Sequence, residues 1–245
     1  MTELNMSPAL RRALELLDDP PNEPDVSSDY LDLLGTSSGD PAVPKNTGPI
    51  QALWASPIGS MLYDKNQALS RRLLTALQYP AEWLDIPQGG IALDVGCGPG
   101  NVTGSLAQAV GPGGLALGVD ISVPMLQRAV GSESGPQVGF LRADAQRLPL
   151  RDNTVDAAVS IAALQLVPNP PAALREMARV LRPGGRLAVM VPTAGRASRL
   201  WRILPSIGAY AFGEDELGAI LEDHGFVSVR TKNSGIFQWV RGKLG

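Results

Sequence analysis

Short apolar runs alternate with amphipathic stretches from residue 91 onward, and this rhythm predicts the main architecture. Five apolar runs have the length of buried strands: 91–95, 115–119, 138–142, 155–160 and 187–191. Stretches with a helical period separate most of them. In the best marked stretch, 169–181, Asn169 can cap the first turn and two prolines follow it. Strands that alternate with helices predict a parallel α/β sheet with right-handed crossovers.

The end of the chain departs from this pattern. Residues 214–224 have a helical period that stops at Gly225. Two strand-like runs follow, 226–232 and 236–241, and only the tripeptide Asn-Ser-Gly joins them. A connection this short places the two strands antiparallel. We therefore expect an α/β sheet that ends in an antiparallel hairpin.

The first 49 residues differ from the rest in charge and composition. They carry nine acidic and three basic residues, a net charge of −6, while the whole chain carries −3. Leu10, Leu14 and Leu17 suit one face of a short helix. The stretch 18–49 holds six prolines, which predicts an extended, partly mobile linker. We therefore expect residues 1–49 to form an acidic, proline-rich extension with one helix.

Residues 50–88 predict a second helical region in front of the α/β core. Pro57 breaks the helix, and leucines at helical spacing line one side of it up to Pro80. Two roles are open for this region: a helix packed on the main domain, or a lid over a substrate pocket. Residues 89–245 then form the core domain.

Charge and composition exclude several kinds of function. The 245 residues include 21 Lys and Arg against 24 Asp and Glu, so the chain lacks the positive charge that holds nucleic acid or an anionic membrane. One cysteine, Cys97, and one histidine, His224, cannot build a disulfide framework or a Cys/His metal site. The N-terminus lacks a secretory signal, and glycine or proline interrupts the long uncharged runs. We therefore expect a cytoplasmic protein with no membrane span.

The strongest local signal is the sequence ALDVGCGPG at residues 92–100. It combines a buried strand, Asp94 near the end of that strand, and glycines where the chain turns into a helix. Glycines let the backbone approach a ligand closely, and the N-terminus of the helix offers N–H groups. The dinucleotide-binding fingerprint fails, because Asn101 and Thr103 stand where its third glycine would be. The phosphate-loop pattern fails too, because no Gly-Lys-Ser/Thr follows.

Two further acids follow the next two strands. Asp120 comes directly after residues 115–119, and its carboxylate can accept hydrogen bonds from both ribose hydroxyls. Asp144 follows the third strand and can accept a hydrogen bond from an exocyclic amine such as that of adenine. Each has a structural alternative: Asp120 can cap a helix before Ser122, and Asp144 can cap its own loop. Three acids after three successive strands, with glycines after the first, together predict a nucleoside site at the carboxyl edge of the sheet.

Four sequence motifs carry a family resemblance. The segments LDVGCGPG, GVDIS-PML, LRADAQRLPL and VPNPPAALREMARVLRPGG resemble those of the class I S-adenosylmethionine-dependent methyltransferases, above all the ubiquinone/menaquinone-biosynthesis type. They cover residues 90–190, and FGEDELGAILEDHGF with the terminal hairpin extends the resemblance to the end of the chain. The resemblance implies a Rossmann-like seven-stranded sheet, mostly parallel with an antiparallel C-terminal strand, behind the N-terminal helical extension. It also implies S-adenosylmethionine (SAM) as the methyl donor and S-adenosylhomocysteine as the product.

The resemblance also implies which residues contact SAM. Asp94 would lie near the methionine amino group, directly or through water. Gly96 and Gly98 would pass under the methionine portion, with Cys97 as a small filler between them, and Asp120 would hold the ribose hydroxyls. The remaining implied contacts are Ile121 and Met125 beside adenine, Asp144 and the backbone of Ala145 at the adenine amine, and Ser160 facing the reacting region.

The catalytic residues are left open by the resemblance. Methyl transfer from a sulfonium needs mainly alignment of the nucleophile with the methyl group and exclusion of water. A hydroxyl or phenol acceptor also needs a base, for which Tyr63, Asp64 and Glu82 are candidates. The Tyr63-Asp64 pair resembles one in a segment that closes over the cofactor in relatives, and its structural alternative is a tyrosine packed on the core. We expect structural roles for Cys97 and for His224, which ends a helix.

The acceptor is expected between residues 50–80 and the insertion 194–212. The insertion is rich in apolar side chains: Leu200, Trp201, Ile203, Leu204, Ile207, Tyr210 and Phe212. This predicts a small hydrophobic or aromatic acceptor such as a quinone, polyketide or lipid precursor, and the alternative is a helix that covers the sheet edge.

Two other functions stay open: a protein or nucleic-acid methyltransferase, and a non-catalytic SAM-binding protein that uses its acidic N-terminus as an interaction arm. The first is disfavoured by the negative charge and by Ala172, which stands where an Asn-Pro-Pro signature of amino-group methylation has an aromatic residue. The oligomeric state is open as well. If the N-terminal stretch is a linker, deleting residues 1–45 should spare the affinity for the cofactor.

Overall fold

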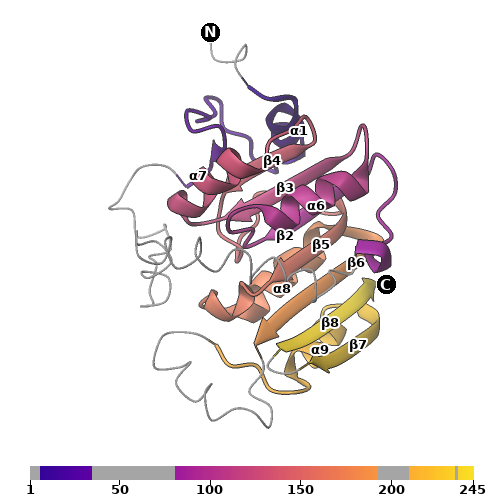
Figure 1. Cartoon of the computed structure of the whole chain (residues 1–245). Coiled ribbons are helices and arrows are strands. Elements are labelled where there is room, and N and C mark those ends of the chain that lie inside the picture. Colours follow the sequence, from indigo (N-terminus) through magenta and orange to yellow (C-terminus); the bar gives the residue numbers. More distant parts are fainter. Residues whose placement is uncertain (1–5, 35–80, 193–209, 235–236) are drawn as a thin grey trace.

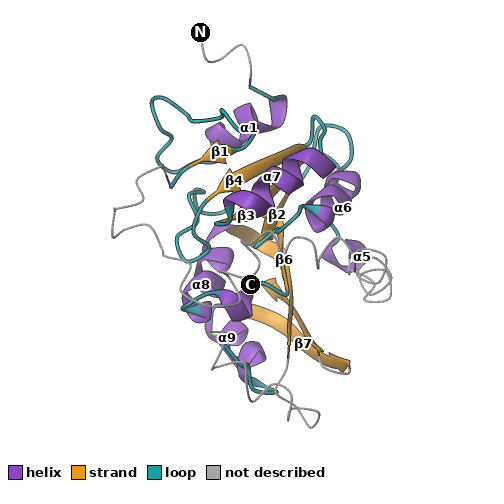
Figure 2. Cartoon of the chain, turned by 60° about the vertical axis from the view of Figure 1, so that its left-hand side comes forward, coloured by secondary structure: helices purple, strands orange, loops and turns teal. Residues whose placement is uncertain are grey.

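The computed structural model describes residues 6–34, 81–192, 210–234 and 237–245, which form one sheet covered by helices on both faces (Figures 1 and 2). The strands in this part of the chain are β1 (Leu31–Asp32), β2 (Ile91–Val95), β3 (Leu115–Asp120), β4 (Val138–Arg142), β5 (Val155–Ile161), β6 (Leu181–Pro192), β7 (Phe226–Ser234) and β8 (Phe237–Leu244). The helices are α1 (Pro8–Leu16), α5 (Ala81–Leu84), α6 (Asn101–Val110), α7 (Val123–Ser132), α8 (Pro170–Val180) and α9 (Glu216–Asp223), with a 3-10 turn, η2, at Leu164–Leu166.

The strand directions confirm the predicted fold class. The strand order is β1-β4-β3-β2-β5-β6-β8-β7. From β4 to β6 all neighbouring strands are parallel, whereas β8 is antiparallel to both of its neighbours, β6 and β7. The sheet is therefore mostly parallel with an antiparallel last strand. It has eight strands rather than seven, because β1 adds in parallel to the outer edge of β4.

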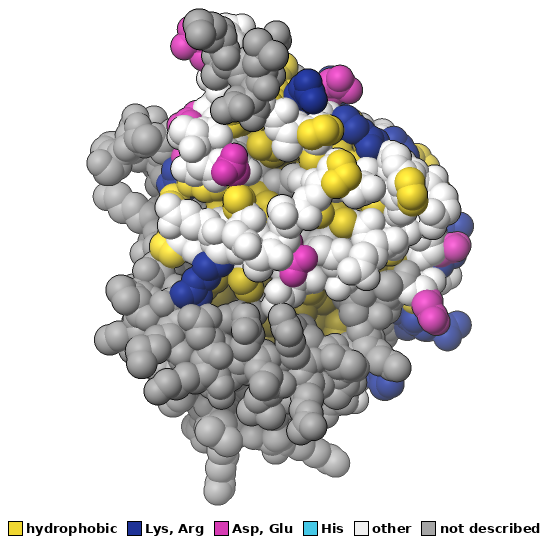
Figure 3. Space-filling view, turned by 45° about the horizontal axis from the view of Figure 1, so that its top comes forward, with side chains coloured by type: hydrophobic (Ala, Val, Ile, Leu, Met, Phe, Trp, Pro, Cys, Tyr) yellow, Lys and Arg dark blue, Asp and Glu magenta, His cyan; other side chains and the backbone are white. Residues whose placement is uncertain are grey.

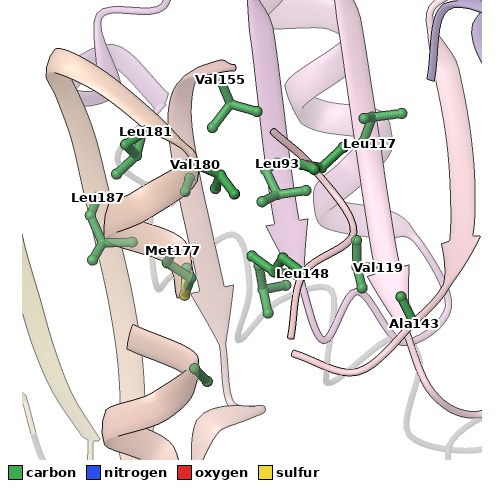
Figure 4. Packing of buried hydrophobic residues seen from close by; sticks show 14 of the residues in the cluster. Leu93, Leu117, Val119, Ala143, Leu148, Val155, Met177, Val180, Leu181 and Leu187 are labelled. Atoms are coloured by element: carbon green, nitrogen blue, oxygen red, sulfur yellow. The ribbon is translucent and has the colours of Figure 1, made fainter. Parts of the chain in front are cut away.

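The central strands are buried on both faces. Along β2 the side chains alternate, so that Leu93 joins the cluster under α1, α8 and α9, whereas Ala92 joins a second cluster under α5 and α6. Figure 4 shows Leu93 and Leu117 of neighbouring strands gathered in one cluster with Met177 and Val180 of α8. Helices on both faces explain why these strands are continuous apolar runs in the sequence.

The predicted N-terminal helix is α1, and it is packed on the sheet. The Ser7 side chain accepts a hydrogen bond from the Leu10 N–H at 3.2 Å, which caps the first turn. Ala9, Leu10 and Ala13 are buried in the same cluster as β3 and β4. The apolar face predicted for this helix therefore belongs to the main core.

The linker predicted for residues 18–49 is wrong for residues 30–34; the described residues 18–29 are irregular and mostly exposed. Tyr30 and Leu31 are only 4% and 0% exposed, and β1 pairs with the end of β4. The helix ends at Leu16, ahead of the prolines, and the apolar residues after them add a strand to an otherwise open sheet edge. Composition reports local stiffness and polarity, and it carries no information about a partner edge more than a hundred residues away.

The predicted boundaries 1–49, 50–88 and 89–245 stay predictions, because residues 35–80 lie outside the described ranges. None of the described helices combines the length and the hydrophobicity needed to cross a membrane.

Candidate functional site

The three predicted acids meet at one edge of the sheet. The strands β2, β3 and β4 are parallel neighbours, so their carboxyl ends lie side by side. Asp94 of β2 pairs in register with Gly118 of β3, and Asp120 at the end of β3 pairs with Arg142 at the end of β4. Asp144 follows two residues later. The topology thus produces the carboxyl-edge arrangement that the sequence predicts.

The glycine turn, residues 96–100, connects β2 to α6 over the end of β3. Gly96 and Gly98 have φ values of 76° and 52°, in the left-handed region that favours glycine. The Gly96 N–H donates to the Val119 carbonyl oxygen at 2.7 Å. A Cβ on Gly96 would lie 2.2 Å from the Cβ of Ala163, whereas a Cβ on Gly98 would meet no atom within 4 Å. The turn is therefore packed at Gly96 and open at Gly98, where a ligand can approach the backbone.

The Asp120 carboxylate is held by backbone N–H groups. Its Oδ2 accepts from Gly98 at 2.9 Å, and its Oδ1 accepts from Ser122 at 2.8 Å. Burial raises the pKa of Asp120, even though these N–H groups and that of Ile121 favour the ionised form. The bond to Ser122 is the capping role considered as the alternative. It is compatible with ribose binding, because each carboxylate oxygen can accept a second hydrogen bond.

Asp94 is almost completely buried, at 1% exposure. The Thr103 hydroxyl donates to its Oδ2 at 2.7 Å. Burial is the main reason that the pKa of Asp94 rises to about 7, and the nearby charge of Asp120 adds to the rise against the opposing hydrogen bonds from Thr103. No basic side chain in the described part of the chain forms an ion pair with either acid. This end of the sheet therefore holds acceptors and uncompensated negative charge.

The residues predicted around adenine lie on neighbouring loops. Asp144 accepts from the backbone N–H of Gln146 at 2.9 Å, and the Gln146 side-chain amide donates to both carboxylate oxygens at 3.1 and 3.2 Å. This is the loop-capping arrangement, and it leaves acceptor capacity for an amine. Ile121 and Ala145 are half-buried, and Met125 is buried on α7. Their contacts with a cofactor stay predictions.

Ser160 and Cys97 both lie inside the protein. The Ser160 hydroxyl donates to the Val95 carbonyl oxygen at 2.8 Å, which ties the end of β5 to the end of β2. Cys97 packs in a small cluster with Phe140, and burial raises the pKa of its thiol well above the usual value. A protonated, buried thiol is a poor nucleophile, which agrees with the structural role expected for Cys97. The approach of Ser160 to the reacting region stays a prediction.

Of the three candidate bases, the structure describes only Glu82. Tyr63 and Asp64 lie outside the described residues. Glu82 is exposed on α5. This helix packs near Arg186, which stands at the start of the parallel part of β6 and pairs with Asp85 at 3.0 Å. That is the amino edge of the sheet, opposite the three acids, so Glu82 is wrong as a base for this site.

Of the seven apolar residues named for the predicted acceptor insertion, the structure describes Tyr210 and Phe212. Phe212 is fully buried in the main cluster, so it belongs to the core and not to a pocket. Tyr210 is 38% exposed and its hydroxyl donates to the Glu216 carboxylate, a hydrogen bond that raises the pKa of Tyr210. The Tyr210 N–H also donates to the Gln165 carbonyl oxygen at 2.7 Å, which brings the end of the insertion to the loop after β5. The other apolar residues of the insertion lie outside the described residues.

Sequence reasoning missed three residues near the site. Thr103 is nine residues after Asp94, on the first turn of α6, and its spacing could have suggested a hydroxyl aimed back at the acid. Arg142 pairs with Asp32 of β1 at 2.8 Å. No local signal identifies that pair, because the two residues are 110 positions apart.

No group of three or more Asp, Glu, His or Cys side chains in the described ranges could hold a metal ion. The face toward the β1 edge carries acidic and basic side chains in small, separate groups among hydrophobic ones (Figure 3). The visible described atoms of that face thus form no continuous basic surface of the kind that binds nucleic acid.

Comparison with known proteins identifies the family. Residues 93–189 match the family model described as a methyltransferase domain. The chain is 33% identical over 178 residues to a demethylmenaquinone methyltransferase of Staphylococcus aureus, a match that covers 61% of this chain and 73% of that protein. The chain belongs to the class I SAM-dependent methyltransferases. Within this family it is of the ubiquinone/menaquinone-biosynthesis type, as its motifs indicate.

A second named relative supports this family, another relative carries no functional name, and a solved structure shows the fold. A 2-phytyl-1,4-naphtoquinone methyltransferase of Thermosynechococcus vestitus is 39% identical over 114 residues, 46% of this chain and 51% of that protein. A protein encoded in transposon TN4556 of Streptomyces fradiae is 46% identical over 110 residues, 44% of this chain and 32% of that protein. The chain thus spans about a third and about half of these two relatives. A SAM-dependent methyltransferase structure from Thermotoga maritima shares the fold, with a TM-score of 0.63, 23% identity, and coverage of 79% of this chain and 99% of that one.

The residues at the carboxyl edge fit SAM. Its ammonium group, its ribose hydroxyls and its adenine amine are all hydrogen-bond donors, and Asp94, Asp120 and Asp144 supply carboxylate acceptors after successive strands. The open space at Gly98 permits close approach of a ligand to the backbone. The cofactor of the family and the chemistry of this edge therefore agree.

Proposed function

We propose that this methyltransferase acts on a small hydrophobic or aromatic acceptor, with a quinone ring as the preferred class. The observation that supports SAM as cofactor is the pair formed by buried Asp94 and half-buried Asp120. They come before and after the glycine turn in the chain, and neither has a basic partner among the described residues. The acceptor half is supported by two relatives, at 39% and 33% identity, whose names specify naphthoquinone and demethylmenaquinone methylation.

In this proposal each side chain at the carboxyl edge has a separate task. Asp94 attracts the methionine ammonium group, and Thr103 fixes the carboxylate that does so. Asp120 accepts from the ribose hydroxyls, while the N–H of Gly98 holds it in place. Asp144, Ala145, Ile121 and Met125 surround adenine. Bound SAM supplies an activated methyl group for in-line displacement, so the chain's main contributions are alignment and exclusion of water.

A methyl-transfer assay tests both the proposed cofactor and the proposed acceptor. The protein would be incubated with SAM labelled on its methyl group and with a reduced, demethylated naphthoquinone that carries an isoprenoid tail, and the products would be partitioned into organic solvent. We expect enzyme-dependent label in the organic phase and much less with Asp120→Ala. Label that appears only in the aqueous phase with a host extract would overturn the hydrophobic acceptor. Absence of transfer in both phases, with SAM binding intact, would favour the non-catalytic alternative.

A further inference from the structure

The N-terminal segment is connected to the turn that we assign to adenosine. In β1, the Asp32 carboxylate accepts from Arg142 Nη1 at 2.8 Å through Oδ2. Its Oδ1 accepts from the Leu34 N–H at 3.0 Å. The two side chains are only 10% and 16% exposed, so this is a largely buried ion pair with defined geometry.

The same guanidinium reaches the cofactor site. Arg142 Nε donates to the Ile121 carbonyl oxygen at 3.4 Å. Ile121 stands between Asp120, the proposed ribose acid, and Ser122, whose N–H donates to that acid. One arginine at the end of β4 therefore joins β1 to the backbone of the turn that carries Asp120. A planar guanidinium has rigidly placed N–H donors, so it can donate hydrogen bonds in two directions at once. A lysine ammonium on a flexible stem does this less well.

A second contact supports the glycine turn. Tyr30, next to β1, is 4% exposed and packs in one cluster with Cys97 of the glycine turn and with Phe140 of β4. A Cβ on Gly100 would lie 2.9 Å from Phe140 Cζ, which shows how closely this cluster approaches the turn. The N-terminal segment thus supports both loops that the proposed cofactor contacts, one by an ion pair and one by packing.

We infer that residues 25–34 are part of the cofactor site, and that Asp32 is a positioning residue that acts through Arg142 on the turn at residues 120–122. This inference rests on the proposed function of that turn. A turn that is already fixed pays less ordering entropy when a ligand binds, so loosening it weakens binding without removing any direct contact. Truncation of residues 1–34 should therefore weaken SAM binding, contrary to the linker prediction.

The chain offers a matched control at the opposite edge of the sheet. Asp156 also pairs with an arginine, Arg182, and its other oxygen accepts from the Ile91 N–H at 2.7 Å. Asp32→Asn and Asp156→Asn therefore each remove the charge of an aspartate that pairs with an arginine and accepts from a backbone N–H, although Arg182 is 46% exposed and Arg142 only 16%. Only the first lies beside the proposed site.

The test compares wild type, Asp32→Asn, Arg142→Lys and Asp156→Asn in the full-length chain. Calorimetric titration with S-adenosylhomocysteine gives the affinities, thermal unfolding gives the stabilities, and hydrogen exchange of the unliganded proteins gives the protection of the amides at 121 and 122. We expect roughly 5- to 30-fold weaker binding for the two variants at the Asp32–Arg142 pair, together with faster exchange in the turn. Asp156→Asn should bind within about twofold of wild type, because distant sites act independently.

Two outcomes would overturn this inference and leave the proposed function intact. Equal affinities for all four proteins would show that the pair does not act on the site. Affinity losses that simply follow the losses in thermal stability, Asp156→Asn included, would show a general effect of folding. A wild-type protein that binds no S-adenosylhomocysteine would instead overturn the proposed function, and the inference with it.

Discussion

The two edges of the parallel sheet use buried aspartates in opposite ways. At the amino edge, Asp156 accepts from a backbone N–H and pairs with Arg182. At the carboxyl edge, Asp94 and Asp120 also accept hydrogen bonds, but no arginine or lysine of the described residues pairs with them. A buried charge with a partner stabilises a structure or costs little, whereas a buried charge without one is a candidate for ligand recognition. In the proposed function, the missing ionic partner is what distinguishes Asp94 and Asp120 from the structural acid Asp156.

The largest effect is expected from Gly96→Ala, which breaks the carboxyl edge itself. The new methyl group would stand 2.2 Å from the Ala163 Cβ, at a φ of 76°. Strain and overpacking together should cost about 2–5 kcal/mol of unfolding free energy, which denaturant unfolding would measure. Gly98→Ala is the control: its φ of 52° is also strained, but its methyl group would meet no atom within 4 Å, so it should lose less stability than Gly96→Ala and also impair cofactor binding. Equal stability losses for both variants would contradict the described packing of the turn.

The comparison of the two edges is tested directly by Asp120→Ala and Asp156→Ala. Loss of Asp120 should weaken SAM binding by about 1–3 kcal/mol, as expected when hydrogen bonds to a charged group disappear. Loss of Asp156 should lower stability and leave SAM affinity near that of wild type, because Ile91 and Arg182 lose their partner far from the site. Titration calorimetry and thermal unfolding of both variants check this. An unchanged affinity in Asp120→Ala would remove Asp120 from the site.

The third prediction concerns pH. The pKa of Asp94 is about 7 in the unliganded protein and ordinarily 3.8, so folding takes up a proton between these values and stability falls as the pH rises through about 7. SAM binding should change in the opposite direction, since its ammonium group prefers the ionised carboxylate. Affinity should therefore rise up to about tenfold per pH unit below 7 and level off above it.

Titrations in buffers of different ionisation enthalpy should detect proton release on binding below pH 7. Asp94→Asn should bind more weakly and lose both the proton release and this pH dependence. A wild-type affinity that is flat between pH 6 and pH 8 would contradict the assignment of Asp94 to the ammonium group.

The smallest effect is expected from His224→Gln. His224 caps the C-terminal end of α9, between that helix and β7. The three acids follow β2, β3 and β4, and three strands lie between β2 and β7 in the sheet. Most methyl-transfer activity should therefore remain. A loss greater than about a hundredfold with normal SAM affinity would show that this imidazole acts in catalysis, because positioned acid–base groups contribute at that scale.

Much of the core was predictable because its signals are local. The strand 91–95 was predicted with its observed bounds, since an apolar run between turn residues has few other solutions in an α/β pattern. The glycines at 96 and 98 were predicted to turn sharply, and both adopt a left-handed φ that other residues avoid. The order of the strands along the chain, with an acid at the end of each, was enough to predict that the three acids share the carboxyl edge of the sheet.

By itself the sequence determined the alternation of strands and helices, the antiparallel last strand and the acids after three strands, because each depends on residues close together in the chain. Only the tertiary structure decided that Tyr30 and Leu31 belong to the core, that Thr103 fixes Asp94, and that Arg142 joins Asp32 to the turn at residues 120–122. These contacts depend on which sheet edge is open and on which charge is left without a partner. Open edges and charges without a partner exist only after the chain has folded, because they depend on segments that are distant in the sequence.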